Sequence, residues 1–322
     1  MRTTTVVCAS VAVSAAAGLL VARLQRSKRK KKVVITGACG NLGTKLGTFL
    51  TLKGHWEVVG IEHPDYLKPR PYRVVSGDVA TVGPWEVALE NVDVVVHFSA
   101  VNPYQNASWA ESALSMSHAF NIFLLAQRYG AKRLVMASSN HVYGGYKDDF
   151  DHGLIRPSDP PRCGTFPLNE HDLKKSGDAV AYAAAKLAAE QLLKTLSSLS
   201  KSLECLVLRV GWCQPGDNSP LTISSAGLPE QFARKVGETK ISTESTDDIW
   251  FKEMWLSNDD FLALFCAALE APLQSPFSTV NAMSHNTGAR WSLQETEAIL
   301  GVTPKDDFHK VLRLHQQQQQ QR

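Results

Sequence analysis

A glycine-rich turn between a short apolar run and a segment with leucines at helical spacing constrains the fold of this chain more than any other feature. The run at residues 32–35 predicts a strand, and residues 42–52 predict a helix. Glycines in the turn and in the first turn of the helix allow a tight turn, close approach of a pyrophosphate and packing of the helix on the strand, while the first N–H groups of the helix face the phosphate. A glycine-rich connection without a ligand is the alternative. The residues predicted to contact a dinucleotide here are Gly37, Gly40, Asn41, Leu42 and Gly43.

The next apolar run, residues 56–62, ends on a carboxylate at the position where an adenosine ribose is expected. Glu62 lies roughly 20 residues after the turn and would accept hydrogen bonds from the ribose hydroxyls. A 2′-phosphate would meet like charge there, so Glu62 favours NAD over NADP. Arg70 and Arg73 lie nearby and moderate that preference.

Strand-like and helical segments alternate along most of the chain. Further strands are predicted over residues 73–75, 92–97, 133–137 and 205–210, and long helices over residues 108–129 and 179–199. This order predicts an α/β fold with a doubly wound parallel sheet of the Rossmann type and a small C-terminal substrate-binding portion. We expect a membrane anchor and polybasic linker over residues 1–32, an NAD-binding domain over 33–212, a substrate-binding portion with returning sheet elements over 213–310, and a disordered Gln-rich tail over 311–322.

Tyr182 and Lys186 are four residues apart on a predicted helix, so their side chains project from one face. The ammonium group would lower the pKa of the phenol, which is otherwise about 10, and make it a proton acceptor for a substrate hydroxyl. Ser139 follows a predicted buried strand and would hold and polarise the reacting oxygen. A surface pair on the helix and a serine that caps a turn are the alternatives.

With the glycine turn, these residues resemble the extended short-chain dehydrogenase/reductase superfamily. The segments Ser138–His141, Trp255–Asp260 and Asn286–Trp291 resemble its uronate dehydrogenase-like branch, and the resemblance covers about residues 32 to 310. It implies oxidation of a uronic acid at its anomeric carbon with NAD as acceptor and Ser139, Tyr182 and Lys186 as catalytic residues. It also implies cofactor contacts at Asp78, Val79, Ser99, Ala100, Tyr182 and Lys186, and substrate contacts at Asn102, Ser139, Asn140 and His141.

Two departures from that branch concern the substrate. The arginine that would bind a substrate carboxylate is absent from the segment before Trp255, where Lys252 is the predicted substitute, and Ser219–Asp247 is an insertion. His141 is alternatively a structural histidine. Three other functions stay open: a nucleotide-sugar epimerase, a membrane-tethered sterol dehydrogenase, and a sensor that binds NAD without turnover.

The amino-acid composition indicates which classes of partner this protein binds. The chain has 322 residues and a net charge of +3, but residues 1–32 hold eight of the 34 basic residues and no acidic one, so the remainder is mildly acidic. No basic stripe with aromatic residues predicts a nucleic-acid partner. The six cysteines show no metal or disulfide spacing, which favours a reducing compartment. We expect a small-molecule substrate of the sugar-acid kind and, from the resemblance, a possible homodimer through the two long helices.

Residues 3–22 form an uncharged stretch long enough to span a bilayer, and basic residues cluster directly after it. This charge asymmetry predicts a membrane anchor with the catalytic domain in the cytosol. A mitochondrial transit peptide is the second interpretation and a secretory signal peptide the third.

Overall fold

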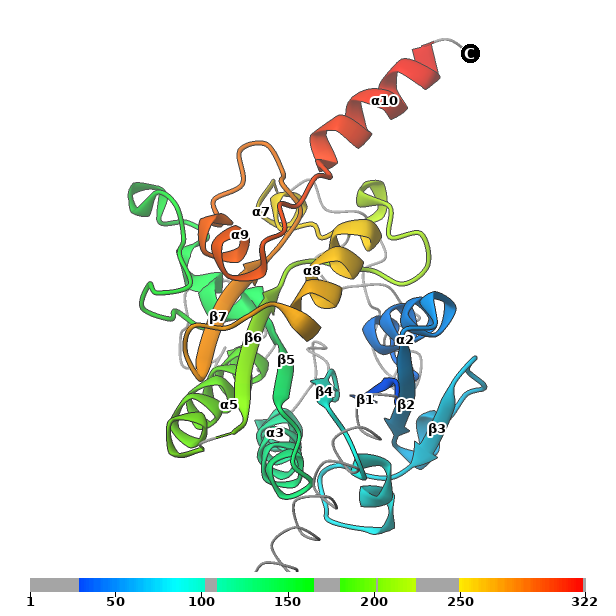
Figure 1. Ribbon diagram of the computed structural model, residues 1–322. Coiled ribbons are helices and arrows are strands. Elements are labelled where there is room, and N and C mark those ends of the chain that lie inside the picture. Colours follow the sequence, from blue (N-terminus) through cyan, green and yellow to red (C-terminus); the bar gives the residue numbers. More distant parts are fainter. Residues whose placement is uncertain (1–28, 102–108, 165–179, 201, 224–248, 321–322) are drawn as a thin grey trace, which may run out of the picture.

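The computed structural model describes residues 29–101, 109–164, 180–200, 202–223 and 249–320, in which strands and helices alternate (Figure 1). The strands are β1 (Lys31–Thr36), β2 (Trp56–Glu62), β3 (Arg73–Ser76), β4 (Val94–His97), β5 (Arg133–Ser139), β6 (Glu204–Val210) and β7 (Phe277–Ala282). The α-helices are α2 (Asn41–Lys53), α3 (Trp109–Arg128), α5 (Val180–Leu199), α7 (Ile249–Glu253), α8 (Asn258–Glu270), α9 (Gln294–Leu300) and α10 (Phe308–Gln320). Short 3₁₀ helices are η1 (Pro64–Tyr66), η2 (Pro84–Leu89), η3 (Asn140–Tyr146), η4 (Phe150–His152) and η5 (Pro220–Thr222).

All seven strands of the described residues pair in parallel, in the order β3-β2-β1-β4-β5-β6-β7. The chain builds outward from β1 to β3 and then returns to place β4 on the other side of β1. The carboxyl ends of β1 and β4 therefore flank the point where the strand order reverses, which is where open parallel sheets bind ligands. The predicted doubly wound α/β fold is confirmed.

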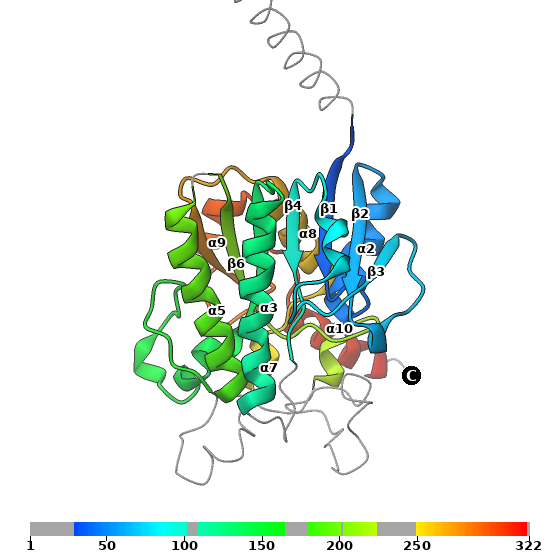
Figure 2. The ribbon, with the colours of Figure 1, turned by 90° about the horizontal axis from the view of Figure 1, so that it is seen from below.

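Helices cover both faces of the sheet, because successive side chains of each strand point to opposite sides. Val33 and Ile35 pack in one core with side chains of α2 and α8, whereas Val34 packs in a second core with side chains of α3 and α5. Figure 2 shows α3 and α5 side by side on one face and α2 and α8 beyond the sheet. The sheet is thus a rigid platform from which loops at the strand ends emerge.

A third apolar cluster lies beyond the carboxyl ends of β5, β6 and β7. It joins side chains of η3 and of the C-terminal portion, including Tyr143, Trp250, Trp255, Met283 and Trp291. The segment after β6 is fixed to this portion by a backbone bridge between Trp212 and Trp255. The C-terminal portion therefore adjoins the sheet edge at which the predicted catalytic residues lie.

The predicted disorder of residues 311–322 is corrected for residues 311–320, which belong to α10. Val311 and Leu312 pack against the third apolar cluster, and glutamine is a good helix former, so the remainder of the segment continues the helix. No helix in the described ranges is long and apolar enough to cross a membrane. The predicted anchor at residues 3–22 lies outside those ranges and stays a prediction.

Candidate active site

The glycine turn lies between β1 and α2 as predicted. Gly37 adopts φ +67°, a conformation that favours glycine, and the Gly40 N–H donates to the Gly37 carbonyl at 3.1 Å. A Cβ on Gly43 would lie 2.2 Å from the Gly37 carbonyl oxygen, so only glycine lets α2 pack against the turn. The backbone of the turn therefore packs closely against the start of α2, and we refer to residues 37–43 as the glycine cradle.

The first turn of α2 keeps its backbone donors available, because Gly40 precedes the helix and no side chain caps it. Asn41 and Leu42 begin the helix, where backbone N–H groups and the positive end of the helix dipole favour an anion. The Asn41 amide donates to the carbonyl of Cys213 at 2.8 Å, which ties the helix to the segment after β6. This uncapped helix end beside the glycine cradle fits the diphosphate of a dinucleotide.

Glu62 lies at the end of β2 against the glycine turn. One carboxylate oxygen accepts from the Cys39 N–H at 2.7 Å and the other from the His63 N–H at 3.0 Å. Burial raises the pKa of Glu62, and these two N–H groups oppose the rise. Arg70 donates to the Thr44 hydroxyl at 3.0 Å and to the Cys39 carbonyl at 2.9 Å, so a cation also borders the turn. The site accordingly fits NAD and leaves NADP as the less favoured cofactor.

The other residues that the resemblance assigns to the cofactor follow β3 and β4. Asp78 accepts from the Ala80 N–H at 2.8 Å, and Asn121 of α3 donates to the carbonyl of Val79 at 3.1 Å, so this loop is held against α3. Ser99 lies two residues after the end of β4, and its backbone N would lie 3.0 Å from a Cβ placed on Gly37. Ala100 is the next residue along the chain. The two loops therefore converge beside the glycine turn.

Ser139, Tyr182 and Lys186 meet where β5 ends and α5 crosses it. The Ser139 hydroxyl accepts from the His141 N–H at 3.2 Å and is hydrogen-bonded to the Tyr182 hydroxyl. The Lys186 ammonium donates to the carbonyl of Ala137 at 2.8 Å and lies 5.7 Å from the centroid of the Tyr182 ring. The structure thus joins the two hydroxyl groups that were predicted to hold the reacting oxygen.

The predicted effect of Lys186 on the Tyr182 phenol is wrong. Burial raises the pKa of Tyr182 to about 12, and the hydrogen bond from Ser139, not the charge of Lys186, opposes that rise. Burial also lowers the pKa of Lys186 to about 8, and the carboxylate of Glu190 opposes this shift. Desolvation is the largest cause for both groups, since Lys186 is buried and Tyr182 is partly buried on the inner side of α5.

Replacing Lys186 with methionine is expected to stabilise the fold while it abolishes turnover. The folded pKa of about 8 lies below the ordinary 10.5, so the penalty for burying the charge is complete below pH 8 and is lost between pH 8 and 10.5. We expect Lys186→Met to add about 1–3 kcal/mol to the free energy of unfolding in urea at pH 7, and much less at pH 10. Lys194→Met, on the exposed side of α5, is the control. A destabilised Lys186→Met at pH 7 would contradict this expectation.

The residues predicted to contact the substrate differ in their burial and in their contacts. Asn140 is buried, and its amide nitrogen donates to the carbonyl of Val210 at 3.0 Å. This hydrogen bond connects the start of η3 to the end of β6. His141 lies beside Tyr182 with ring centroids 6.0 Å apart. Lys252 lies on α7 and is partly buried. Asn102 and most of the predicted insertion lie outside the described residues, so their roles stay predictions.

A buried ion pair behind α5 was missed by the sequence analysis. Arg209 of β6 donates to both carboxylate oxygens of Glu190, at 2.7 to 3.2 Å, and the two side chains are 4% and 1% exposed. The hydroxyl of Ser138 also donates to Glu190, and Arg209 donates to the hydroxyl of Tyr143. The signal was present, since Glu190 continues the four-residue spacing of Tyr182 and Lys186 and Arg209 interrupts an apolar strand.

Two histidines near the cofactor loops were also missed. His97, at the end of β4, is hydrogen-bonded through Nδ1 to the Thr36 hydroxyl at 2.8 Å, and burial lowers its pKa. His118 of α3 is hydrogen-bonded to the Ser99 hydroxyl at 3.3 Å. A single histidine at a strand end or on a helix carries little information in one sequence. Nothing in the sequence pattern therefore distinguished His97 and His118 from ordinary structural histidines.

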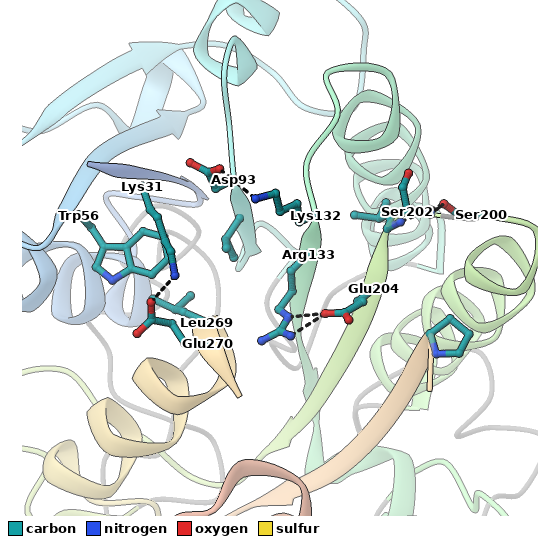
Figure 3. Close-up of a pocket in the computed structure, with 13 residues that line it drawn as sticks. Lys31, Trp56, Asp93, Lys132, Arg133, Ser200, Ser202, Glu204, Leu269 and Glu270 are labelled. Atoms are coloured by element: carbon teal, nitrogen blue, oxygen red, sulfur yellow. Dashed lines mark hydrogen bonds and ion pairs between the residues drawn. The ribbon is translucent and has the colours of Figure 1, made fainter. Parts of the chain in front are cut away.

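A hollow of about 460 Å³ at the opposite end of the sheet does not belong to this site (Figure 3). It is lined by residues at the amino ends of the strands, and its charges pair with one another. Arg133 binds Glu204 at 2.5 Å, Lys31 binds Glu270 at 2.7 Å, and Lys132 lies 4.0 Å from Asp93. Among the described residues no group of three or more potential metal ligands occurs.

Comparison with known proteins gives consistent matches. The family model described as "NAD dependent epimerase/dehydratase family" matches residues 33–276. L-arabinose 1-dehydrogenase (NAD(P)(+)) of Haloferax volcanii is 27% identical over 291 residues, which are 87% of this chain and 99% of that protein. Uronate dehydrogenase of Pseudomonas putida is 31% identical over 121 residues, 37% of this chain and 44% of that protein. The structure of a glucuronic acid dehydrogenase from Chromohalobacter salexigens superposes with a TM-score of 0.62 at 22% identity, and covers 89% of each chain.

Proposed function

This chain belongs to the NAD-dependent epimerase/dehydratase family, and from that premise we propose that it oxidises a sugar hydroxyl with NAD through Ser139, Tyr182 and Lys186. The observation that carries the proposal is the hydrogen-bonded pair of Ser139 and Tyr182, with Lys186 one helical turn away, at the same sheet edge as the glycine cradle. A donor–acceptor pair at this edge serves a substrate that lies over the nucleotide crevice.

Ser139 and Tyr182 would bind the substrate oxygen together, which orients the carbon that carries it. As that carbon loses hydride, the Tyr182 oxygen takes the hydroxyl proton, and the Ser139 hydroxyl stabilises the charge that develops on the oxygen. Lys186, whose charge does not lower the pKa of Tyr182, would contribute to the site as a contact to NAD. NAD, when bound, accepts the hydride.

The names of the relatives define the substrate class only broadly. An arabinose dehydrogenase and uronate dehydrogenases both act on sugars, and the resemblance seen in the sequence implies a uronic acid. The full chain should therefore be assayed with NAD for NADH absorbance against neutral sugars and uronic acids. NADH formation with at least one sugar is expected, and formation with none would refute the proposal.

A sterol substrate is the second candidate, because aromatic side chains lie beside His141. Oxidation of a 3β-hydroxysteroid with no turnover of sugars would establish it. An epimerase would interconvert a nucleotide sugar without net NADH, and a sensor would bind NAD with no turnover of any substrate.

Pairing into a homodimer and attachment to a membrane stay proposals of the same kind. On α3, Met116, Phe120 and Leu124 are each 41% exposed and spaced four residues apart, which gives an apolar row suited to a second copy. Attachment and cytosolic placement rest on residues 3–32 alone. Elution of the detergent-solubilised chain at the mass of a dimer, lost in Phe120→Glu, would support the pairing.

A further inference from the structure

A row of rings leads away from the catalytic pair. The His141 ring lies 6.0 Å from the Tyr182 ring on one side and 6.2 Å from the Trp212 ring on the other, both edge to face. The Phe251 ring lies 5.9 Å beyond Trp212. A substrate held at Tyr182 therefore has Trp212 within reach of its far side.

The backbone of Trp212 is held by hydrogen bonds on both sides. Its N–H donates to the Met254 carbonyl at 2.7 Å, and its carbonyl accepts from the Leu256 N–H at 2.9 Å. The tryptophan is partly buried, so part of its surface remains accessible to a ligand. The Trp212 ring itself packs between the rings of His141 and Phe251, and these two contacts hold it in position.

The imidazole in this row is a neutral group. Burial lowers the pKa of His141 to about 4, so at physiological pH it can donate or accept a hydrogen bond but offers no positive charge. An aromatic face is electron-rich and repels an anion, and a carboxylate taken out of water without a partner is costly. The C–H bonds of a sugar ring, by contrast, pack well on such a face.

We propose that Trp212 is a specificity-determining residue and that the substrate is an uncharged aldose rather than a uronic acid. The inference rests on the proposed function. The cyclic aldose loses hydride from its anomeric carbon to NAD and the proton of its anomeric hydroxyl to Tyr182, so that aldose and NAD⁺ give lactone, NADH and one proton. The far carbons of the sugar lie on His141 and Trp212.

Matched substrate pairs test this directly. The full chain is assayed with D-galactose against D-galacturonate and with D-glucose against D-glucuronate, which differ at the carbon farthest along the chain, and with L-arabinose. We expect kcat/KM to be at least about tenfold higher for the neutral member of each pair that is turned over. A preference for uronates, with NADH formed, would overturn this inference and leave the proposed function standing.

Variants at Trp212 separate recognition from folding. Trp212→Ala should lower kcat/KM for aldoses by about tenfold or more, whereas Trp212→Phe, which keeps a ring, should stay within a few-fold. Trp212→Arg should move the aldose-to-uronate ratio at least about tenfold toward uronates, because a guanidinium binds a carboxylate. Trp56→Ala, at the opposite end of the sheet, is the matched control and should leave the ratio unchanged. An unchanged ratio in Trp212→Arg would overturn the role of Trp212.

Lys252 offers the opposing explanation, since it follows Phe251 and was predicted to bind a carboxylate. If Lys252→Met selectively removed uronate turnover, the substrate would be charged and the inference would be wrong. We expect Lys252→Met to leave the aldose-to-uronate ratio unchanged. A chain that formed no NADH with any sugar would overturn the proposed function and this inference together.

Discussion

Replacing Tyr182 with phenylalanine is expected to lower kcat for sugar oxidation by about 10²- to 10⁴-fold, the range associated with a positioned acid–base group. The substitution removes only the hydroxyl that is hydrogen-bonded to Ser139 and leaves the ring beside His141. Binding of NAD, followed by quenching of tryptophan fluorescence, should change little because the glycine turn is untouched. Tyr129→Phe, directly after the last residue of α3, is the control and should retain full activity.

The pH profile gives the same prediction a second readout. Burial raises the pKa of Tyr182 to about 12, so the phenol is protonated at neutral pH and oxidation by the wild-type protein should accelerate as pH rises. Tyr182→Phe should lose that acceleration because no phenol remains to titrate. Equal activity of the variant and the wild type would exclude Tyr182 as the base and favour a protein that binds NAD without this chemistry.

The fold was predictable because its strands are short, apolar and β-branched and its turn is rich in glycine. Those patterns are local, and the parallel order follows from alternating strands and helices. The last strand, β7, has the sequence Phe-Ser-Thr-Val-Asn-Ala, in which polar residues interrupt the apolar run, so its range was not predicted. The tail was assigned to disorder from composition, whereas the structure continues it as α10.

The sequence predicted that Ser139, Tyr182 and Lys186 lie close together, as they do in the structure, but it did not predict their electrostatics. Spacing alone put Tyr182 and Lys186 on one helical face, but the sign of the pKa shift of Tyr182 depends on how deeply the phenol is buried, and burial is a tertiary property. The hydrogen bond from the Asn140 amide nitrogen to the Val210 carbonyl is likewise a tertiary contact, and the predicted substrate contact of Asn140 stays a prediction. A role for Trp212 could not be predicted from the sequence, because it depends on ring contacts with His141 and Phe251, which are distant along the chain.

Replacing Arg209 with methionine is expected to lower the free energy of unfolding by about 3–5 kcal/mol, because the Glu190 carboxylate would be left buried without its cation. Glu190 is 1% exposed and Arg209 4%, so water cannot take over the lost contacts. Burial already opposes the charge of Lys186 one turn away, which limits its use as a substitute partner. Chemical unfolding in urea, with equal slopes for variant and wild type, measures the loss.

The double variant Arg209→Met with Glu190→Leu separates an unpaired charge from lost packing. Removing both charged groups should recover most of the stability that Arg209→Met loses, since apolar side chains of similar volume often replace a buried pair at little cost. Arg133→Met, which breaks the pair with Glu204 at the other end of the sheet, is the control and should cost less, because the Glu204 side chain is 40% exposed and water can solvate its carboxylate. If the double variant were as unstable as Arg209→Met alone, the hydrogen bonds of Arg209 to Tyr143 and to the carbonyl of Pro157, and not its charge, would account for the loss by holding η3 and the loop at Pro157 against β6.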